Sequence, residues 1–155
     1  TFCNSGKANV SLVGDAGGKY TSRTGLVLNE ISGEVDLSSS LPGIYTVAYS
    51  LSNDVCSLVA TTTLIINALP VISKITGVQS LLVGTSSQLN SGTKGGSWSS
   101  SNKSIASVNA TGLVTGLKKG SAEIFYIVKN ESCTDSVSIQ IMSVFKSWRH
   151  GENNE

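Results

Sequence analysis

Hydrophobic and polar residues alternate along several short stretches of the chain, most clearly in residues 44–51. There Tyr45, Val47, Tyr49 and Leu51 are separated by smaller or polar residues. Successive side chains of a strand point to opposite faces, so this period of two predicts a half-buried β-strand. Residues 56–66, 122–128 and 133–141 alternate in the same way. No stretch shows the sustained three- and four-residue spacing of an amphipathic helix. The pattern therefore predicts an all-β protein.

The best of these stretches occurs twice, once in each half of the chain. Gly43 recurs as Gly120 and Cys56 as Cys133, and the segment that begins at Gly43 aligns with the one that begins at Gly120 without a gap. Each copy is expected to be strand, polar turn and strand. A long period of this kind is typical of modular chains rather than of one catalytic globule. It favours a mechanical or adhesive role.

Turn signals divide the chain into many short strands and one larger boundary. Asn67–Pro70 is the best boundary, because proline cannot donate to a strand ladder and the residue before it prefers an extended conformation. We expect two tandem Ig-like β-sandwiches over residues 1–68 and 71–142, followed by a tail or linker over residues 143–155. The glycines that we expect in turns are Gly33, Gly43, Gly112 and Gly120.

Composition narrows the class of protein further. Apolar residues make up 39% of the chain and charged residues only 14%, with a net charge of +1. The apolar content and the alternation argue against disorder, and the near-neutral charge argues against binding to nucleic acid. No apolar run is long enough to span a membrane as a helix. Because the sequence starts at Thr1 without a signal peptide, we interpret it as a mature or excised piece of a longer protein.

Four blocks of the second half carry a resemblance to a known family. They are Trp98–Asn102, Ile105–Asn109, Gly112–Gly116 and Gly120–Ile124. Their order and spacing resemble the bacterial Ig-like group 2 (BIG2) domain over residues 72–142. In the first half, Gly25–Asn29, Gly33–Leu37 and Pro42–Val47 resemble the Ig-like or cadherin-like modules of bacterial surface proteins. The pair is similar to tandem modules in large surface adhesins of Bacteroidetes.

The resemblance implies a function without catalysis. It implies a structural or adhesive segment of a secreted or cell-surface bacterial protein, with no catalytic residues and no cofactor. The partners would be neighbouring Ig-like modules of the same polypeptide, and surface glycans or proteins of the host or cell surface. An accessory carbohydrate-binding or spacer module of a secreted enzyme is the alternative. Phe125, whose side chain is expected to point away from the core, is the candidate contact for such a ligand.

Large side chains at alternating positions are expected to fill the two cores. We predict this for Tyr45, Tyr49 and Tyr126, and for Trp98 as a plug between the sheets of the second domain. Trp98 can instead stack on a ligand, but its place within a strand pattern favours the core.

Three cysteines leave one without a partner inside the chain. Cys3 and Cys56 are positioned to join the two ends of the first domain, and such a bridge suits a secreted protein. The alternative is three separate buried thiols. Cys133 occupies the hairpin position of Cys56 in the second copy. Related modules often place a cysteine where Leu82 stands here, so the resemblance implies that Cys133 is unpaired or available to a partner.

Residues that could carry chemistry are sparse. His150, the only histidine, lies in the tail, so the serines lack a base. No loop offers the six or more oxygens that Ca²⁺ prefers, although a weak calcium site at Asp15 or Asp36 stays open. The three cysteines are too far apart in sequence, with no histidine near, for a zinc site. We therefore expect neither an enzyme nor a metalloprotein.

Overall fold

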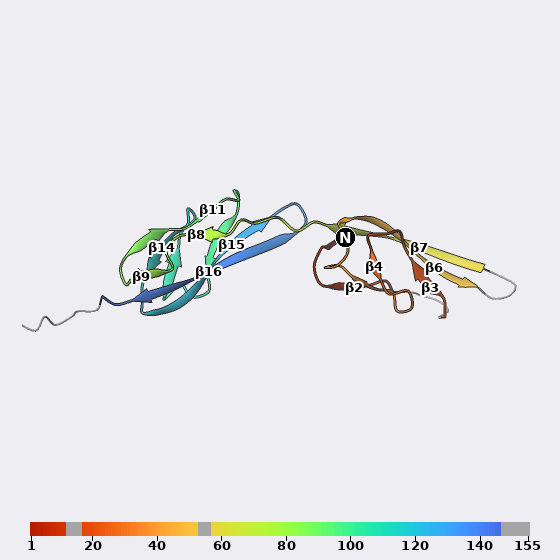
Figure 1. The fold of residues 1–155 in the computed structure, drawn as a ribbon, viewed down its shortest axis with the longest axis horizontal. Coiled ribbons are helices and arrows are strands. Elements are labelled where there is room, and N and C mark those ends of the chain that lie inside the picture. Colours follow the sequence, from red (N-terminus) through yellow and green to blue (C-terminus); the bar gives the residue numbers. More distant parts are fainter. Residues whose placement is uncertain (12–16, 53–56, 147–155) are drawn as a thin grey trace, which may run out of the picture. The chain divides into compact units, whose positions relative to one another are not determined.

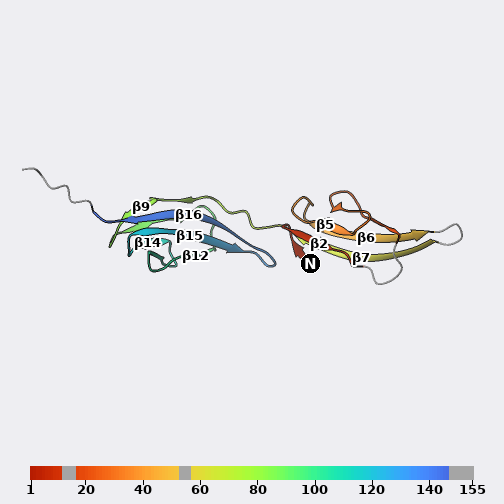
Figure 2. The ribbon, with the colours of Figure 1, turned by 90° about the horizontal axis from the view of Figure 1, so that it is seen from below.

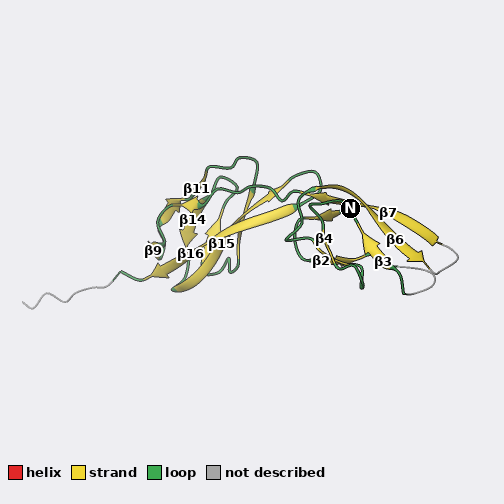
Figure 3. Ribbon diagram, turned by 45° about the vertical axis from the view of Figure 1, so that its right-hand side comes forward, coloured by secondary structure: helices red, strands yellow, loops and turns green. Residues whose placement is uncertain are grey.

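The computed structural model describes residues 1–11, 17–52 and 57–146. All of its regular elements are strands, and the described residues contain no helix (Figure 3). It therefore holds no helix that could cross a membrane. The chain divides into two compact units. The first comprises residues 1–69 and 130–133, and the second comprises residues 70–129 and 134–155.

The first unit is a sandwich of two sheets (Figure 1). One sheet has the strand order β1-β7-β6-β3, and the other has the order β2-β5-β4. Their bounds are β1 (Phe2–Cys3), β2 (Lys7–Asn9), β3 (Lys19–Thr21), β4 (Val27–Leu28), β5 (Glu34–Asp36), β6 (Gly43–Ser52) and β7 (Ser57–Asn67). The core between the sheets is built from Tyr20, Val35, Leu37, Tyr45, Val47, Tyr49, Leu64 and Ile66.

The second unit repeats this plan with one additional pair of strands. Its sheets have the orders β9-β16-β15-β12 and β10-β14-β13, and β11 pairs with β8. The bounds are β8 (Ile75–Thr76), β9 (Ser80–Leu82), β10 (Ser86–Gln88), β11 (Asn90–Ser91), β12 (Ser97–Ser100), β13 (Ala106–Val108), β14 (Leu113–Gly116), β15 (Gly120–Lys129) and β16 (Thr134–Val144). β16 thus ends two residues after the predicted domain end at 142.

The repeat seen in the sequence is a repeat of the hairpin register. β6 pairs with β7 so that Gly43 lies opposite Ile66, and β15 pairs with β16 so that Gly120 lies opposite Ser143. The alignment that places Gly43 on Gly120 also places Ile66 on Ser143. β15 and β16 run side by side in Figure 2, as β6 and β7 do. The predicted fold class of two tandem Ig-like sandwiches is confirmed.

One strand differs from its prediction. Residues 56–66 alternate in sequence and predict one buried face along the whole strand. In the structure Leu64 and Ile66 are buried, but every residue from Ser57 to Thr63 is exposed. The reason is that nothing among the described residues covers this half of β7, so alternation in the sequence is not matched by burial.

Candidate functional site

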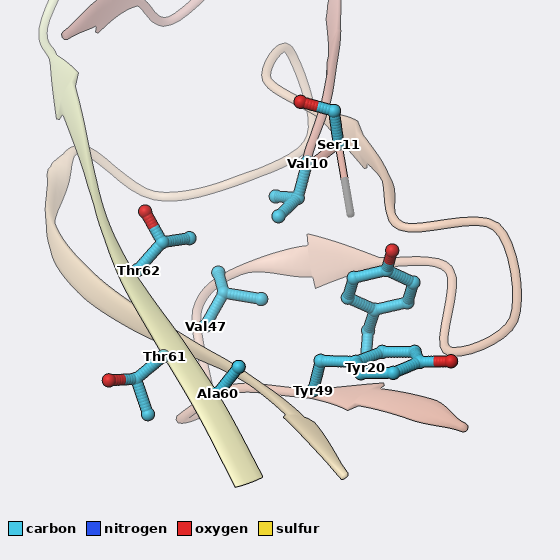
Figure 4. Close-up of a pocket in the computed structure, with 8 residues that line it drawn as sticks. All are labelled: Val10, Ser11, Tyr20, Val47, Tyr49, Ala60, Thr61 and Thr62. Carbon is cyan, nitrogen blue, oxygen red and sulfur yellow. The ribbon is translucent and has the colours of Figure 1, made fainter. Parts of the chain in front are cut away.

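A groove opens along the exposed half of β7 in the first unit (Figure 4). Its volume is about 290 Å³, and it is lined by Val10, Ser11, Tyr20, Val47, Tyr49, Ala60, Thr61 and Thr62. Val47 and Tyr49 come from β6, and Ala60–Thr62 come from β7. The described residues that line the groove are uncharged and include both apolar and hydroxyl-bearing side chains.

Two tyrosines form the floor of the groove at one end. The rings of Tyr20 and Tyr49 lie 4.8 Å apart between centroids, tilted by 54°. The backbone N–H of Gly18 donates to the hydroxyl of Tyr49 over 2.6 Å. A Cβ at Gly18 would lie 2.6 Å from the Tyr49 ring, so glycine is required for this approach.

The second unit contains the same arrangement in its own core. Trp98 and Tyr126 have ring centroids 4.7 Å apart, and Gly96 donates its N–H to the Tyr126 hydroxyl over 2.8 Å. The Tyr126 hydroxyl in turn donates to the carbonyl of Thr93 over 2.7 Å. The paired rings and the glycine are therefore a structural device common to both sandwiches.

Sequence reasoning missed Tyr20. Tyr20 is the single aromatic residue of the polar stretch that follows Gly17 and Gly18 and ends at Thr24. In the structure β3 pairs with β6, with Tyr20 opposite Tyr49, and Tyr20 is buried. Lys19, Tyr20 and Thr21 alternate over three residues only, which is too short to predict a strand from the sequence. The pairing of these residues with β6 in the structure identifies them as one.

The other residues singled out from the sequence lie as follows. The three predicted core tyrosines are buried in the cores of their units: Tyr45, Tyr49 and Tyr126. Trp98 is half-buried and packs against the buried residues of the second core. The Tyr45 hydroxyl donates to the carbonyl of Leu41 over 2.6 Å, and the guanidinium of Arg23 lies 4.5 Å from the centre of the Tyr45 ring.

The predicted turn glycines adopt backbone conformations that favour glycine. Gly33 and Gly112, which end matching turns, have φ of 73° and 86°. In the second of these turns the side-chain oxygen of Asn109 accepts hydrogen bonds from the backbone N–H groups of Thr111 and Leu113. Gly43 and Gly120 begin the long strands β6 and β15.

Cys3 forms a disulfide with Cys133, not with Cys56. The predicted bridge from Cys3 to Cys56 and the predicted free thiol at Cys133 are both wrong. Cys133 lies in the β15–β16 turn, and this turn, residues 130–133, belongs to the first unit. The prediction assumed that each copy closes on itself, but the Cα atoms of Cys3 and Cys133 lie only 5.7 Å apart. Cys56 lies outside the described residues.

Hydrogen bonds hold the turn in place around the disulfide. The Asn130 side-chain amide donates to the carbonyl of Ala68 over 3.0 Å, and its oxygen accepts from the N–H of Cys133 over 2.7 Å. On the other side of the bond, the N–H of Asn4 donates to the carbonyl of Asn67 over 2.9 Å. Cys133 is almost completely buried, with 1% of its surface exposed.

Two charged groups in the described part of the first unit have a shifted pKa, and both lie at the surface. Lys7 and Glu34 form an exposed ion pair of 2.7 Å, and this hydrogen bond raises the pKa of Lys7. The hydroxyl and the N–H of Ser39 donate to the Asp36 carboxylate and lower its pKa. Asp15, the other residue considered for calcium, lies outside the described residues, as does His150. The described residues contain no group of three or more histidine, cysteine or acidic side chains that could hold a metal ion.

Exposed aromatic side chains are few in the described part of the chain. Phe2 and Phe145 are 40% and 65% exposed, one in each unit. Phe125, the predicted ligand contact, is half-buried on β15, where it pairs with Ser99 and Ser138. A sugar-binding platform needs a flat, accessible ring, and Phe125 is only partly accessible.

The second half of the chain matches a known protein family. Residues 66–139 match the family of bacterial Ig-like domains, group 2. The resemblance seen in the sequence is therefore confirmed. The matched residues include the strands of the second unit from β8 to β15. None of the curated proteins matches the sequence.

Several solved structures resemble this chain with low sequence identity and low TM-scores. The C-terminal fragment of intimin, solved with the intimin-binding domain of its receptor Tir, has 22% identity and a TM-score of 0.40 over 81% of this chain and 51% of that one. A SusE-like, surface-located polysaccharide-binding protein from Bacteroides thetaiotaomicron has 19% identity and a TM-score of 0.44, over 83% of this chain and 29% of that one. Human protocadherin-24 EC1-2 has 13% identity and a TM-score of 0.33, over 94% and 93%. The chain thus spans about half of the intimin fragment and less than a third of the polysaccharide-binding protein.

Proposed function

We propose that this chain is a non-catalytic segment of a secreted or cell-surface bacterial protein, where its tandem Ig-like sandwiches serve a structural or adhesive role. The observation that carries the proposal is the disulfide between Cys3 and Cys133 in a chain with a bacterial Ig-like domain. Structural disulfides persist in oxidising compartments outside the cytosol. They also stabilise small domains that bury little surface.

The distribution of titratable groups supports a role without catalysis. Catalytic groups are commonly found where burial and charged neighbours shift their pKa strongly. In the described part of the chain, the groups with a shifted pKa, Lys7 and Asp36, lie at the surface and interact with surface neighbours. The described residues that line the groove of the first unit have uncharged side chains. These features fit a module that binds or spaces and does not transform a substrate.

The partners proposed for such a module are neighbouring Ig-like modules of the same polypeptide and macromolecules at a cell surface. The test is to treat intact producing cells with a protease that cannot enter them, and to follow this chain with an antibody. We expect the chain to be cleaved on intact cells or to be found in the medium. Detection only after the cells are lysed would contradict the proposal.

The alternative function is an accessory carbohydrate-binding or spacer module of a secreted enzyme. This alternative predicts the same location outside the cytosol but a carbohydrate ligand. Binding of the oxidised chain to a glycan array therefore distinguishes it from the structural or adhesive role. Because Phe125 is half-buried, we expect no saturable binding that depends on this ring. Saturable binding to one class of glycan, lost on Phe125→Ala but kept on Phe145→Ala, would favour the alternative.

A further inference from the structure

A pocket of about 300 Å³ opens beside Trp98 in the second unit. All of its lining comes from residues 89–126, so the pocket belongs to a single sandwich. Trp98 on β12 and Tyr126 on β15 supply its aromatic part. Its polar side chains include those of Asn90, Ser91, Lys94 and Thr111. Small-molecule sites have volumes from roughly 300 Å³ upward, so this pocket has room for one ring-sized group.

Hydrogen bonds within the unit hold both walls of this pocket. The Tyr126 hydroxyl, which accepts from Gly96 and donates to Thr93, fixes the loop between β11 and β12. On the other wall, the side-chain oxygen of Asn109 accepts from the N–H of Thr111 over 3.0 Å and from its hydroxyl over 2.8 Å. The walls are therefore in place before a ligand binds, which reduces the entropy lost on binding.

The first unit has a tyrosine at the position of Trp98. Tyr20 lies opposite Tyr49 on β6, just as Trp98 lies opposite Tyr126 on β15. Tyr20 is only 6% exposed, whereas Trp98 is half-buried. A tyrosine is thus large enough to close the core at this position, and the indole adds a part that solvent can reach.

Trp98 also has a donor that the fold does not use. In the described structure its indole N–H donates no hydrogen bond, and the nitrogen is not sealed from solvent. Tryptophan N–H groups in protein interiors usually find a partner. The side-chain amide of Asn90 and the ammonium of Lys94 line the same pocket and likewise have no partner among the described residues. Three donors at one pocket are therefore available to a ligand.

The charge of the second unit favours an anionic ligand. Its described residues include two acidic residues, Glu123 and Asp135, and neither lines the pocket. They also include seven lysines: Lys74, Lys94, Lys103, Lys118, Lys119, Lys129 and Lys146. This excess of positive charge attracts an anionic polymer over a distance. Lys94 places one cation at the pocket itself.

We infer that this pocket binds one carboxylate-bearing pyranose ring of an acidic polysaccharide. The Lys94 ammonium pairs with the carboxylate, and the indole N–H and the Asn90 amide donate to oxygens of the sugar. The accessible part of the indole packs against the C–H groups of the ring. The inference names a ligand class for the proposed adhesive role, and it rests on the proposed location outside the cytosol.

The test is a titration of tetragalacturonate into the oxidised full chain, followed by NMR. The indole resonance of Trp98 is assigned by its absence from Trp98→Tyr. We expect this resonance to shift saturably, together with backbone signals of Lys94 and Thr111. Maltotetraose has the same number of rings without carboxylates, and amidated tetraglutamate has the same number of carboxylates without rings. Each control ligand should bind about tenfold more weakly or less.

Three single substitutions separate the pocket from the overall charge. Trp98→Tyr introduces the residue that the first unit has here, so the fold should be kept while affinity falls about tenfold. Lys94→Gln should weaken binding about threefold or more, because it removes the cation at the pocket. Lys119→Gln changes the net charge equally at a residue outside the lining and should have less than about half of that effect. A melting curve of each variant verifies that it is folded.

Four results would overturn the inference. The first is the absence of a saturable shift at Trp98 with tetragalacturonate. The second is equal weakening by Lys94→Gln and Lys119→Gln, which would assign the binding to the net charge of the unit. The third and fourth are equally tight binding of tetraglutamate, which would indicate an acidic peptide, or of maltotetraose, which would indicate a neutral sugar. None of these results changes the outcome of protease treatment of intact cells, so the proposed location is tested separately.

Discussion

Cys3 and Cys133 are joined by a disulfide although they lie 130 positions apart in the sequence. The bond closes a covalent loop over residues 4–132, which includes every strand from β2 to β15. Only the residues up to Cys3 and those from Cys133 onward lie outside this loop. A force applied to the two termini is therefore carried through the disulfide and β16, and it does not extend the strands inside the loop.

We expect the oxidised chain to resist extension when it is pulled from Thr1 and Glu155 in a single-molecule force experiment. An extended chain spans at most about 3.6 Å per residue, so the loop hides about 460 Å of contour length. Reduction, or Cys133→Ser, should make this length available as additional unfolding steps.

The matched control for this experiment is Cys56→Ser. The third cysteine is not part of the bond, so this change should leave the oxidised traces unaltered, and alkylation of the oxidised wild-type chain should label one thiol, at Cys56. Release of the full contour length from the oxidised wild type would show that the loop is not closed.

Glycine at position 112 is required for two separate reasons. Its φ is 86°, and a Cβ there would lie 2.7 Å from the carbonyl oxygen of Leu89 and 2.9 Å from the Trp98 ring. Gly84 has nearly the same φ, 85°, but no atom lies within 4 Å of its added Cβ. Alanine at Gly84 therefore tests the cost of the backbone conformation alone, whereas alanine at Gly112 tests that cost together with steric overlap.

We expect Gly84→Ala to lower the free energy of unfolding by about 1 kcal/mol, the cost of a left-handed alanine. Gly112→Ala should lower it by about 3 kcal/mol or more, because the carbonyl and the indole must move as well. Urea unfolding monitored by tryptophan fluorescence, to which Trp98 and Trp148 both contribute, measures both losses. Equal losses in the free energy of unfolding would mean that the close contacts around Gly112 do not add to the cost of the substitution.

Ser143 lies in a position where the first unit has an isoleucine. The two residues, Ser143 and Ile66, occupy equivalent places in β16 and β7, and both are buried. Gly116 approaches Ser143 so closely that a Cβ on the glycine would lie 2.6 Å from the serine hydroxyl. A larger residue than serine would not fit, but within the described structure the hydroxyl has no hydrogen-bond partner.

We therefore expect Ser143→Ala to raise the free energy of unfolding by about 1 kcal/mol, since it removes an unsatisfied buried polar atom with little change in volume. Ser143→Ile should lower it, because the side chain overlaps the backbone at Gly116. A loss of stability in Ser143→Ala would imply that the hydroxyl has a partner, such as a buried water.

The parts of the fold that depend on local alternation could be predicted from the sequence. Tyr45, Val47 and Tyr49 define β6, and the matching segment that begins at Gly120 defines β15 with the same register. The disulfide could not be predicted in this way, because cysteine spacing carries no information on which turn folds against Cys3. That choice depends on tertiary structure.

The groove could not be predicted for a related reason. Ala60 and Thr62 fall on the same predicted face of their strand as Val137 and Ile139 do on theirs, although residues 60–63 alternate less clearly than residues 137–140. Burial also requires a covering segment, which Ile72 and Ile75 provide for the second unit. A strand's own pattern shows which face can be buried but not whether another segment covers it.

The Asp36 carboxylate makes the stability of the first unit sensitive to acid. The hydroxyl of Ser39 donates to one carboxylate oxygen over 2.8 Å, and the N–H of Ser39 donates to the other over 3.1 Å. These bonds favour the charged form and lower the pKa of Asp36 from its ordinary value of 3.8. Because the folded pKa is the lower one, the stabilisation is complete above pH 3.8 and is lost as the pH falls through the folded value.

We expect Asp36→Asn to be less stable than the wild type near neutral pH, with the difference shrinking as the pH falls below 3.8. Urea midpoints measured from about pH 7 to pH 2 test this linkage. Ser39→Ala removes the larger of the two donor contributions and should reduce the acid dependence while the backbone N–H maintains part of it. A difference between wild type and Asp36→Asn that stays constant down to the lowest pH would mean that the aspartate stabilises the Asp36–Ser40 turn through its shape and not through its charge.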